Sequence, residues 1–187
     1  MTKDDLNRKQ TTIFSADVAG FGRLMCHDEL TTVITISAYR QLISELTERY
    51  RGRVVDAVGD NLLAEFGSPV DAIAAAVAVQ KELRSRNAEL TADKRMLFRI
   101  GINYGEVIAE GGRLYGTGVN IAARLESKAD PGGICISRAV VDRVRDRLPL
   151  HYEYMCKCSV KNICEKVEIF RIAEGAESKK TVRCKRR

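Results

Sequence analysis

The chain has 187 residues, of which 45% are hydrophobic and 30% are charged, and its formal net charge is +6. This length and composition fit one globular domain with a substantial core and exclude an intrinsically disordered chain. No run approaches the roughly 18 apolar residues of a membrane-spanning helix, and the polar segment 1–10 lacks the apolar centre of a secretory signal. We therefore expect a cytoplasmic protein without a membrane span.

Much of the positive charge lies at the end of the chain, where six basic residues follow position 178. Residues 174–187 are expected to form a basic, disordered tail. Such a tail can contact nucleic acid or acidic lipid. No nucleic-acid-binding motif accompanies it, so no nucleic-acid partner is expected.

The chain contains six cysteines, and a cytoplasmic setting makes disulfides unexpected. Cys156, Cys158 and Cys164 lie close together in sequence but lack the Cys-x2-Cys spacing of zinc sites. Two interpretations stay open for this group: inert thiols, or a cluster that responds to redox state or binds a metal.

The first predicted element is a strand over residues 11–18 (TTIFSADV), which ends in Asp17 and a glycine turn. There the carboxylate and backbone groups can face a ligand, or Asp17 can instead cap a following helix. A long amphipathic helix is predicted over residues 30–50, because apolar residues recur at helical spacing and Gly52 follows.

Residues 53–66 (RVVDAVGDNLLAEF) predict a β-hairpin. Two apolar runs flank Gly59, Asp60 and Asn61, which are residue types that tolerate a tight reversal. At the hairpin tip, two paired strands would fix the backbone of Asp60 while its oxygens stay accessible. Such a carboxylate suits Mg²⁺, which keeps open positions for phosphate. The alternative is a turn aspartate that only caps its own backbone.

Ser68 and Pro69 predict the start of a helix that runs to about Ala88. Residues 97–109 (LFRIGINYGEVIA) predict either one strand or two strand segments broken by a bulge. A turn at residues 111–112 follows.

The next predicted helix begins near Thr117 and places Asn120 and Arg124 on one face, one turn apart. An amide beside a guanidinium can bind a sugar and a phosphate chain. The alternative is a solvated helix face.

Four further elements are predicted. A strand at residues 134–137 leads into a helix at 138–147, which Ser137 caps. Two strands follow at 151–160 and 167–173, and the connection between them contains Lys161. The complete order is β-α-β-β-α-β followed by α-β-α-β-β. The first six elements predict a ferredoxin-like unit, which is an antiparallel sheet with helices on one face.

Six motifs occur in a fixed order: FSADVAGFGRLM (14–25), VGDNLLAEF (58–66), FRIGINYGEVI (98–108), YGTGVNIAARLES (115–127), PGGICIS (131–137) and VKN (160–162). Together they resemble the class III nucleotide cyclase domain, and they are most similar to bacterial adenylate cyclase domains of the class IIIb type. The resemblance implies an α+β fold with a ferredoxin-like βαββαβ core and a C-terminal extension. It places this cyclase domain at residues 11–173.

The resemblance also implies a head-to-tail homodimer with active sites at the interface. Asp17 and Asp60 of one chain would hold two Mg²⁺ or Mn²⁺ ions per site, with the backbone of Val18 as a further metal ligand. One ion would lower the pKa of the ribose 3′-hydroxyl of ATP or GTP, and both would neutralise the α-phosphate during in-line attack. The products would be a 3′,5′-cyclic nucleotide and pyrophosphate.

Asn120 and Arg124 would come from the other chain, where Asn120 orients the ribose and Arg124 stabilises charge in the transition state. Lys161 matches the lysine that binds the terminal phosphates. Backbone groups of Gly20 and Phe21 would cradle the phosphate chain.

The two base-reading positions depart from the adenylate cyclase pattern. Asp56 stands where the family has its adenine-reading lysine, and Arg113 stands where the family has an aspartate or threonine. Ionised Asp56 only accepts hydrogen bonds and Arg113 only donates them. This pair fits guanine, which offers N1–H and its amino group as donors and O6 as an acceptor. The closest resemblance therefore favours ATP, and the base-reading pair favours GTP.

A further alternative is that Asp56 and Arg113 form an ion pair with each other and read no base. Asn61 also replaces the glycine that commonly follows the hairpin aspartate, although asparagine tolerates the left-handed conformation. On this interpretation the domain is weakly active, or it is an inactive dimerisation or regulatory module.

Overall fold

The computed structural model describes residues 7–159 and 166–173. Within them, strands and helices follow the order β1 Asn7–Val18, α1 Phe21–His27, α2 Glu29–Arg49, β2 Gly52–Val58, β3 Asn61–Phe66, α3 Pro69–Ala88, β4 Phe98–Glu110, β5 Arg113–Tyr115, α4 Thr117–Lys128, β6 Ile134–Ser137, α5 Arg138–Val144, β7 His151–Ser159 and β8 Lys166–Ala173. None of these helices has the length and apolar character needed to cross a membrane.

The strands form one sheet in the order β2-β3-β1-β4-β6-β8-β7, and β5 pairs with β4 beside this path. Neighbouring strands are antiparallel except β4 and β6, which are parallel. The central pair is β1 with β4, which runs from Asn7 opposite Ala109 to Val18 opposite Phe98. The order β2-β3-β1-β4 is that of a ferredoxin-like unit. The α+β fold expected from the sequence is therefore confirmed.

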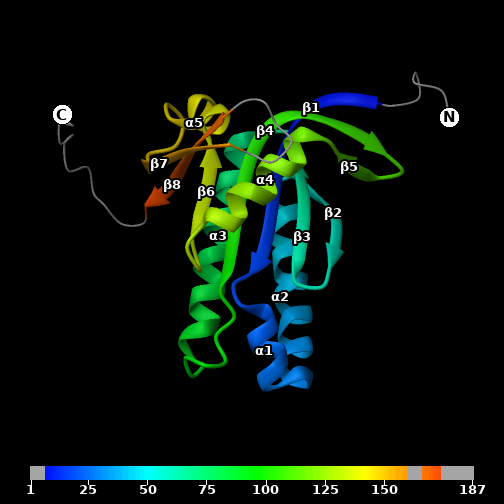
Figure 1. The fold of residues 1–187 in the computed structure, drawn as a ribbon, viewed down its shortest axis with the longest axis vertical. Coiled ribbons are helices and arrows are strands. Elements are labelled where there is room, and N and C mark those ends of the chain that lie inside the picture. Colours follow the sequence, from blue (N-terminus) through cyan, green and yellow to red (C-terminus); the bar gives the residue numbers. More distant parts are fainter. Residues whose placement is uncertain (1–6, 160–165, 174–187) are drawn as a thin grey trace.

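Helices cover both faces of the sheet (Figure 1). The larger apolar core lies between the sheet and helices α2, α3 and α5, and Phe14 of β1 belongs to it. On the opposite face Ile13 packs with Leu114 of β5 and Ala122 of α4. Successive residues of a strand point to opposite faces, so β1 is buried on both sides. The predicted one-sided arrangement holds for α2 and α3, whereas α4 crosses the other face.

Most predicted boundaries agree with the structure, with a few differences. Strand β1 begins at Asn7 instead of residue 11, because residues 7–10 pair with the far end of β4. The short elements α1 and β5 are additional, and α5 ends at Val144. Ser137 occupies the N-cap position of α5 but makes no capping bond, and its buried hydroxyl has no hydrogen-bond partner among the described residues.

The β-bulges lie in β2 and β7, whereas β4 pairs with β1 without a register shift. In β2, Val54 pairs with Ala64 and Asp56 pairs with Leu63, so Val55 is the extra residue. Ala64 belongs to the core on the α2 side, and Leu63 packs on the α4 side. The bulge therefore turns Asp56 onto the α4 face, whereas regular alternation from Val54 would place it on the α2 face.

Two of the clustered cysteines are in contact. The Sγ atoms of Cys156 and Cys158 on β7 lie 3.1 Å apart, and both residues pack beside buried Cys135 against α4. Burial raises the pKa of the Cys135 thiol to about 12, which keeps this thiol protonated. Cys164 lies outside the described residues.

Helix α4 lies directly on β4 because a glycine occupies the contact point. A Cβ atom at Gly101 would lie 2.2 Å from both the carbonyl oxygen of Ala122 and the backbone nitrogen of Glu126. These are backbone atoms of α4, so any side chain at position 101 has to displace the helix. The close approach fixes the height of α4 above the sheet.

We expect Gly101→Ala to lower the free energy of unfolding by about 3 kcal/mol or more, because the added methyl group overlaps helix backbone. Urea denaturation measures this difference. Gly67→Ala is the matched control, since a Cβ atom at Gly67 meets nothing within 4 Å. The control should lie within about 0.5 kcal/mol of the parent chain. Equal denaturation midpoints for the two variants would contradict the close packing of α4 on β4.

Candidate active site

The two carboxylates predicted as metal ligands lie at the same end of the sheet. Asp17 is near the end of β1, and Asp60 lies in the turn between β2 and β3. Ala16 pairs with Leu62, so the end of β1 lies beside this hairpin turn. Arg99 on β4 is within electrostatic reach of both carboxylates, because the contact with Asp17 and the more distant charge of Asp60 both raise its pKa. The structure thus brings Asp17 and Asp60 together.

Arg99 is the ion-pair partner of Asp17. Its Nε donates to Oδ1 of Asp17 at 2.9 Å, and its Nη2 donates to Oδ2. The exposed fractions of the two side chains are 26% for Arg99 and 17% for Asp17, so the pair is partly shielded from water. A bidentate, charge-assisted contact fixes the plane of the carboxylate. The capping role considered for Asp17 is wrong, since Gly20 is the N-cap residue of α1.

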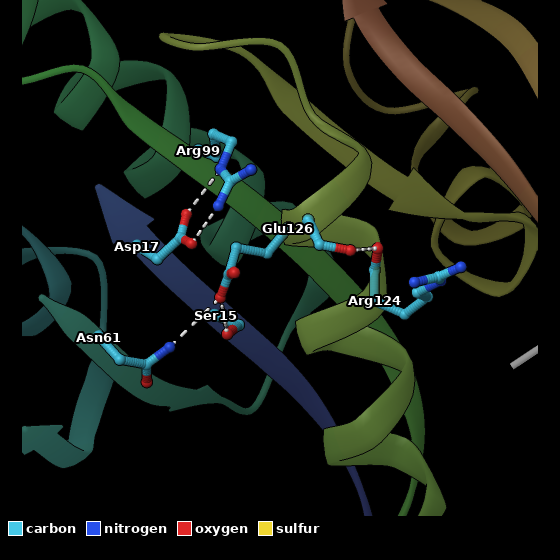
Figure 2. A network of polar contacts seen from close by, with 7 residues as sticks. Ser15, Asp17, Asn61, Arg99, Arg124 and Glu126 are labelled. Carbon is cyan, nitrogen blue, oxygen red and sulfur yellow. Dashed lines mark hydrogen bonds and ion pairs between the residues drawn. The ribbon is translucent and has the colours of Figure 1, made fainter. Parts of the chain in front are cut away.

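Glu126 is a buried third carboxylate that the sequence analysis did not single out. It lies on the inner face of α4 (Figure 2). Ser15 Oγ donates to Glu126 Oε2 at 2.6 Å, and Asn61 Nδ2 donates to the same oxygen at 3.4 Å. The pKa of Glu126 is raised to about 7, mainly by burial and also by neighbouring Asp17, against opposing effects of Ser15 and Arg99.

This raised pKa predicts how the stability of the metal-free protein depends on pH. In the unfolded chain Glu126 ionises near its ordinary pKa of about 4.3, whereas the folded chain retains the proton until about pH 7. The contribution of Glu126 to the free energy of unfolding is therefore complete below its pKa in the unfolded chain, and it is lost as the pH rises to 7. We expect the free energy of unfolding to fall by roughly 2–3 kcal/mol over this range relative to Glu126→Gln. Urea titrations in EDTA measure it, and parallel pH profiles would contradict it.

Asn120 and Arg124 lie on the outer face of α4, where both are exposed, while Ala122 and Leu125 point to the sheet. Figure 2 shows the Arg124 guanidinium directed away from Asp17 and from the Glu126 carboxylate. The structure brings Asn120 and Arg124 to one surface. Within one chain, however, it does not bring them to the aspartates.

The chain between β1 and α1 turns sharply at the predicted phosphate-contacting positions. Val18 is buried, and the Ala19 N–H donates to Leu97 O at 2.9 Å. Gly20 has φ 71°, a left-handed conformation that favours glycine, and Phe21 begins α1. First-turn N–H groups have no partner within their own helix and can face an anion. Lys161 lies outside the described residues.

The predicted base-reading residues lie on two neighbouring segments, Asp56 at the β2 bulge and Arg113 at the β4–β5 turn. Asp56 accepts a hydrogen bond from the Ala57 N–H at 2.9 Å, and Arg113 is exposed at the start of β5. Arg53 of β2 donates to Gly112 O at 3.2 Å, so β2 contacts the turn before Arg113. No ion pair joins Asp56 to Arg113 among the described side chains.

The donor set fits a hard divalent cation, which takes oxygen ligands. In residues 7–159 and 166–173, no three His, Cys, Asp or Glu residues form a metal-binding cluster. Asp17 and Asp60 would therefore supply two carboxylates and leave the other coordination positions to backbone oxygen, water and substrate phosphate. Such partial protein coordination is typical of Mg²⁺ bound with phosphates.

Arg99 and Glu126 are the polar residues of this site that the sequence analysis missed. The sequence contains one signal for Glu126. This acidic residue lies four positions after Ala122, on the apolar face of the predicted helix. A carboxylate on an inward helical face requires a polar partner.

Comparisons with known proteins agree with this architecture. The profile of a family described as "Adenylate and Guanylate cyclase catalytic domain" matches residues 5–173. A protein named "Putative adenylate cyclase 3" from Rhizobium meliloti is 36% identical over 171 residues, which are 91% of this chain and 29% of that protein. The chain thus spans about a third or less of the length of the curated relatives that it matches first.

Two solved structures share the fold over nearly their whole length. An adenylate/guanylate cyclase/hydrolase from Silicibacter pomeroyi has a TM-score of 0.85 and 32% identity, covering 91% of this chain and 99% of that chain. The guanylyl cyclase Cya2 has a TM-score of 0.77 and 25% identity, with coverages of 92% and 95%. The chain therefore belongs to the family of adenylate and guanylate cyclase catalytic domains and has the class III nucleotide cyclase fold.

Proposed function

We propose that the domain is a cytoplasmic purine nucleotide cyclase that converts ATP or GTP to a 3′,5′-cyclic nucleotide and pyrophosphate at the interface of a head-to-tail homodimer. One observation carries this proposal. Asp17 and Asp60 lie at one end of the sheet, whereas Asn120 and Arg124 are exposed on the outer face of α4 and Arg124 points away from Asp17 (Figure 2). A single chain therefore holds two halves of a catalytic set, and a second copy is needed to complete each site.

Asp17, Asp60 and a backbone group of Val18 would hold two Mg²⁺ or Mn²⁺ ions. When bound, such ions lower the pKa of the attacking 3′-hydroxyl and offset charge on the α-phosphate. Arg99 orients the Asp17 carboxylate through its bidentate contact. This carboxylate is thus held in one orientation before a cation or substrate binds.

Asn120 and Arg124 of the partner subunit would act from the opposite side of the nucleotide. The amide orients the ribose, and the guanidinium stabilises negative charge as it develops on the phosphates. Lys161 would contact the terminal phosphates, and the backbone at Gly20 and Phe21 would contact the phosphate chain.

Base specificity would rest on Asp56 and Arg113. We expect Asp56→Lys combined with Arg113→Asp to shift the ratio of kcat/KM for ATP over GTP upward by about 100-fold or more, because donors and acceptors that do not match the bound base discriminate strongly. Initial rates with each nucleotide measure the ratio. A charge exchange of the exposed pair Arg8 and Glu106, which lies 2.7 Å apart, is the matched control. An unchanged ratio in the Asp56/Arg113 double variant would show that this pair does not read the base.

Product identification tests the proposed activity. The purified chain would be incubated with Mn²⁺ and either ATP or GTP, and nucleotides would be separated by chromatography. Cyclic GMP supports the cyclase and the base-reading pair. Cyclic AMP supports the cyclase and contradicts the role given to Asp56 and Arg113. If a protein shown to be dimeric forms neither product, the proposed enzymatic activity is wrong, and the result favours a dimerisation or regulatory module.

A further inference from the structure

We propose that Glu126 is a positioning residue that holds the end of β1 and the tip of the β2–β3 hairpin together, so that Asp17 and Asp60 act as one metal-binding pair. This inference rests on the proposed cyclase function, because it assigns Glu126 to the carboxylate half of that site. Glu126 itself touches neither substrate nor metal in this account.

The contacts of Glu126 reach the neighbours of both aspartates. Its Oε2 accepts from Ser15 at 2.6 Å and from Asn61 at 3.4 Å. Ser15 lies two residues before Asp17 and so shares its face of β1, which is the α4 face. Asn61 directly follows Asp60. One carboxylate oxygen therefore connects the two segments that carry the proposed metal ligands.

The position of Glu126 is itself tightly fixed. The residue is 5% exposed. Its backbone nitrogen is one of the two α4 atoms that pack against Gly101 of β4. Arg99, two residues before Gly101, stabilises the local negative charge and pairs with Asp17. A buried carboxylate with two donors, held by close backbone packing, acts as a rigid support for the segments that it contacts.

The same helix carries Arg124 on its outer face, so a change at Glu126 has two possible routes to activity. One route runs through Asp17 and Asp60 in the same chain. The other runs through displacement of α4 and of Arg124, which serves the site shared with the partner subunit. Because the two routes act on different sites of the dimer, heterodimers separate them.

The test uses a heterodimer of an Arg124→Ala chain and an Asp17→Ala chain, in which one site is intact. Adding Glu126→Ala to the Arg124→Ala chain, which supplies the working aspartates, should lower the rate by about 10–100-fold, as loss of a ligand-orienting partner does. It should also raise the Mn²⁺ concentration needed for half-maximal rate. When Glu126→Ala is instead added to the Asp17→Ala chain, which supplies Arg124, the factor by which the rate falls should be at least about tenfold smaller. Equal losses, or the reverse order, would overturn the proposal.

The outcomes separate this proposal from the proposed function. If the parent heterodimer without Glu126→Ala is inactive, the shared-site cyclase fails. If the parent is active and the placement of Glu126→Ala makes no difference, only the positioning role fails.

A second measurement needs no activity. Amide hydrogen exchange of the metal-free protein should be faster at residues 15–18 and 57–62 in both Glu126→Ala and Ser15→Ala. The Ser15→Ala variant removes one hydrogen-bond donor and keeps Glu126. Glu126→Gln, which retains an acceptor for Ser15, should recover most of the protection. Glu82→Ala, on an exposed face of α3, is the control for a lost carboxylate. Unchanged exchange at both segments in Ser15→Ala and Glu126→Ala would also overturn the proposal.

Discussion

Asp17→Ala and Asp60→Ala should each lower the rate of cyclic nucleotide formation by about 1,000-fold or more. Each substitution removes one of the two carboxylates that would hold the metal ions, and bound metal supplies several kcal/mol of transition-state stabilisation. The measurement is kcat with Mn²⁺ and the preferred nucleotide. The loss should remain when Mn²⁺ is raised to millimolar concentration, because Glu126, the remaining carboxylate of this site, is only 5% exposed.

The two variants should differ in stability. Asp17→Ala leaves the partly buried Arg99 guanidinium without its partner, which should cost about 1–3 kcal/mol. Asp60→Ala, in a turn, should cost less. Asp142→Ala, an exposed aspartate on α5, is the matched control for activity and folding. A folded Asp60→Ala chain that keeps a tenth of the parent activity would contradict the role of the hairpin carboxylate.

Arg124→Ala should lower kcat by about 100- to 1,000-fold, the magnitude found when a positioned donor to developing negative charge is removed. Stability and dimer formation should change little, because the side chain is exposed and points away from the core. The measurements are kcat for activity, urea denaturation for stability and sedimentation for the dimer.

Lys128→Ala is the matched control for Arg124→Ala, since it removes an exposed cation one turn later on the same helix. Its kcat should stay within about twofold of the parent, because a lone surface charge contributes little. Equal activities of the two variants would show that Arg124 has no special role on the surface of α4.

Local sequence patterns predict the elements that carry the site. The hairpin around Asp60 follows from two β-rich runs and a turn-forming tripeptide, and both of its strands are observed. The face shared by Asn120 and Arg124 follows from helical periodicity. Such signals lie within one element, so the sequence contains all of the required information.

Contacts between distant elements were not predictable in the same way. The pair of Asp17 and Arg99 joins residues 82 positions apart, and the contact of Ser15 with Glu126 joins residues 111 positions apart. Each depends on strand order and on how close α4 lies to β4. The bulge at Val55 likewise depends on pairing with β3, whereas the glycines of residues 97–109 suggest a possible bulge in β4. Strand β5 has three residues, too few for a periodic signal.

The most direct test of a site shared between two copies is to mix Asp17→Ala chains with Arg124→Ala chains and measure cyclic nucleotide formation. Each variant alone should retain about 1% of the parent activity or less, because both of its sites lack one essential group. An equal mixture should regain about a quarter of the parent activity, since half of randomly formed dimers are heterodimers and each has one complete site of two. An inactive mixture in which heterodimers are demonstrated would contradict the shared site.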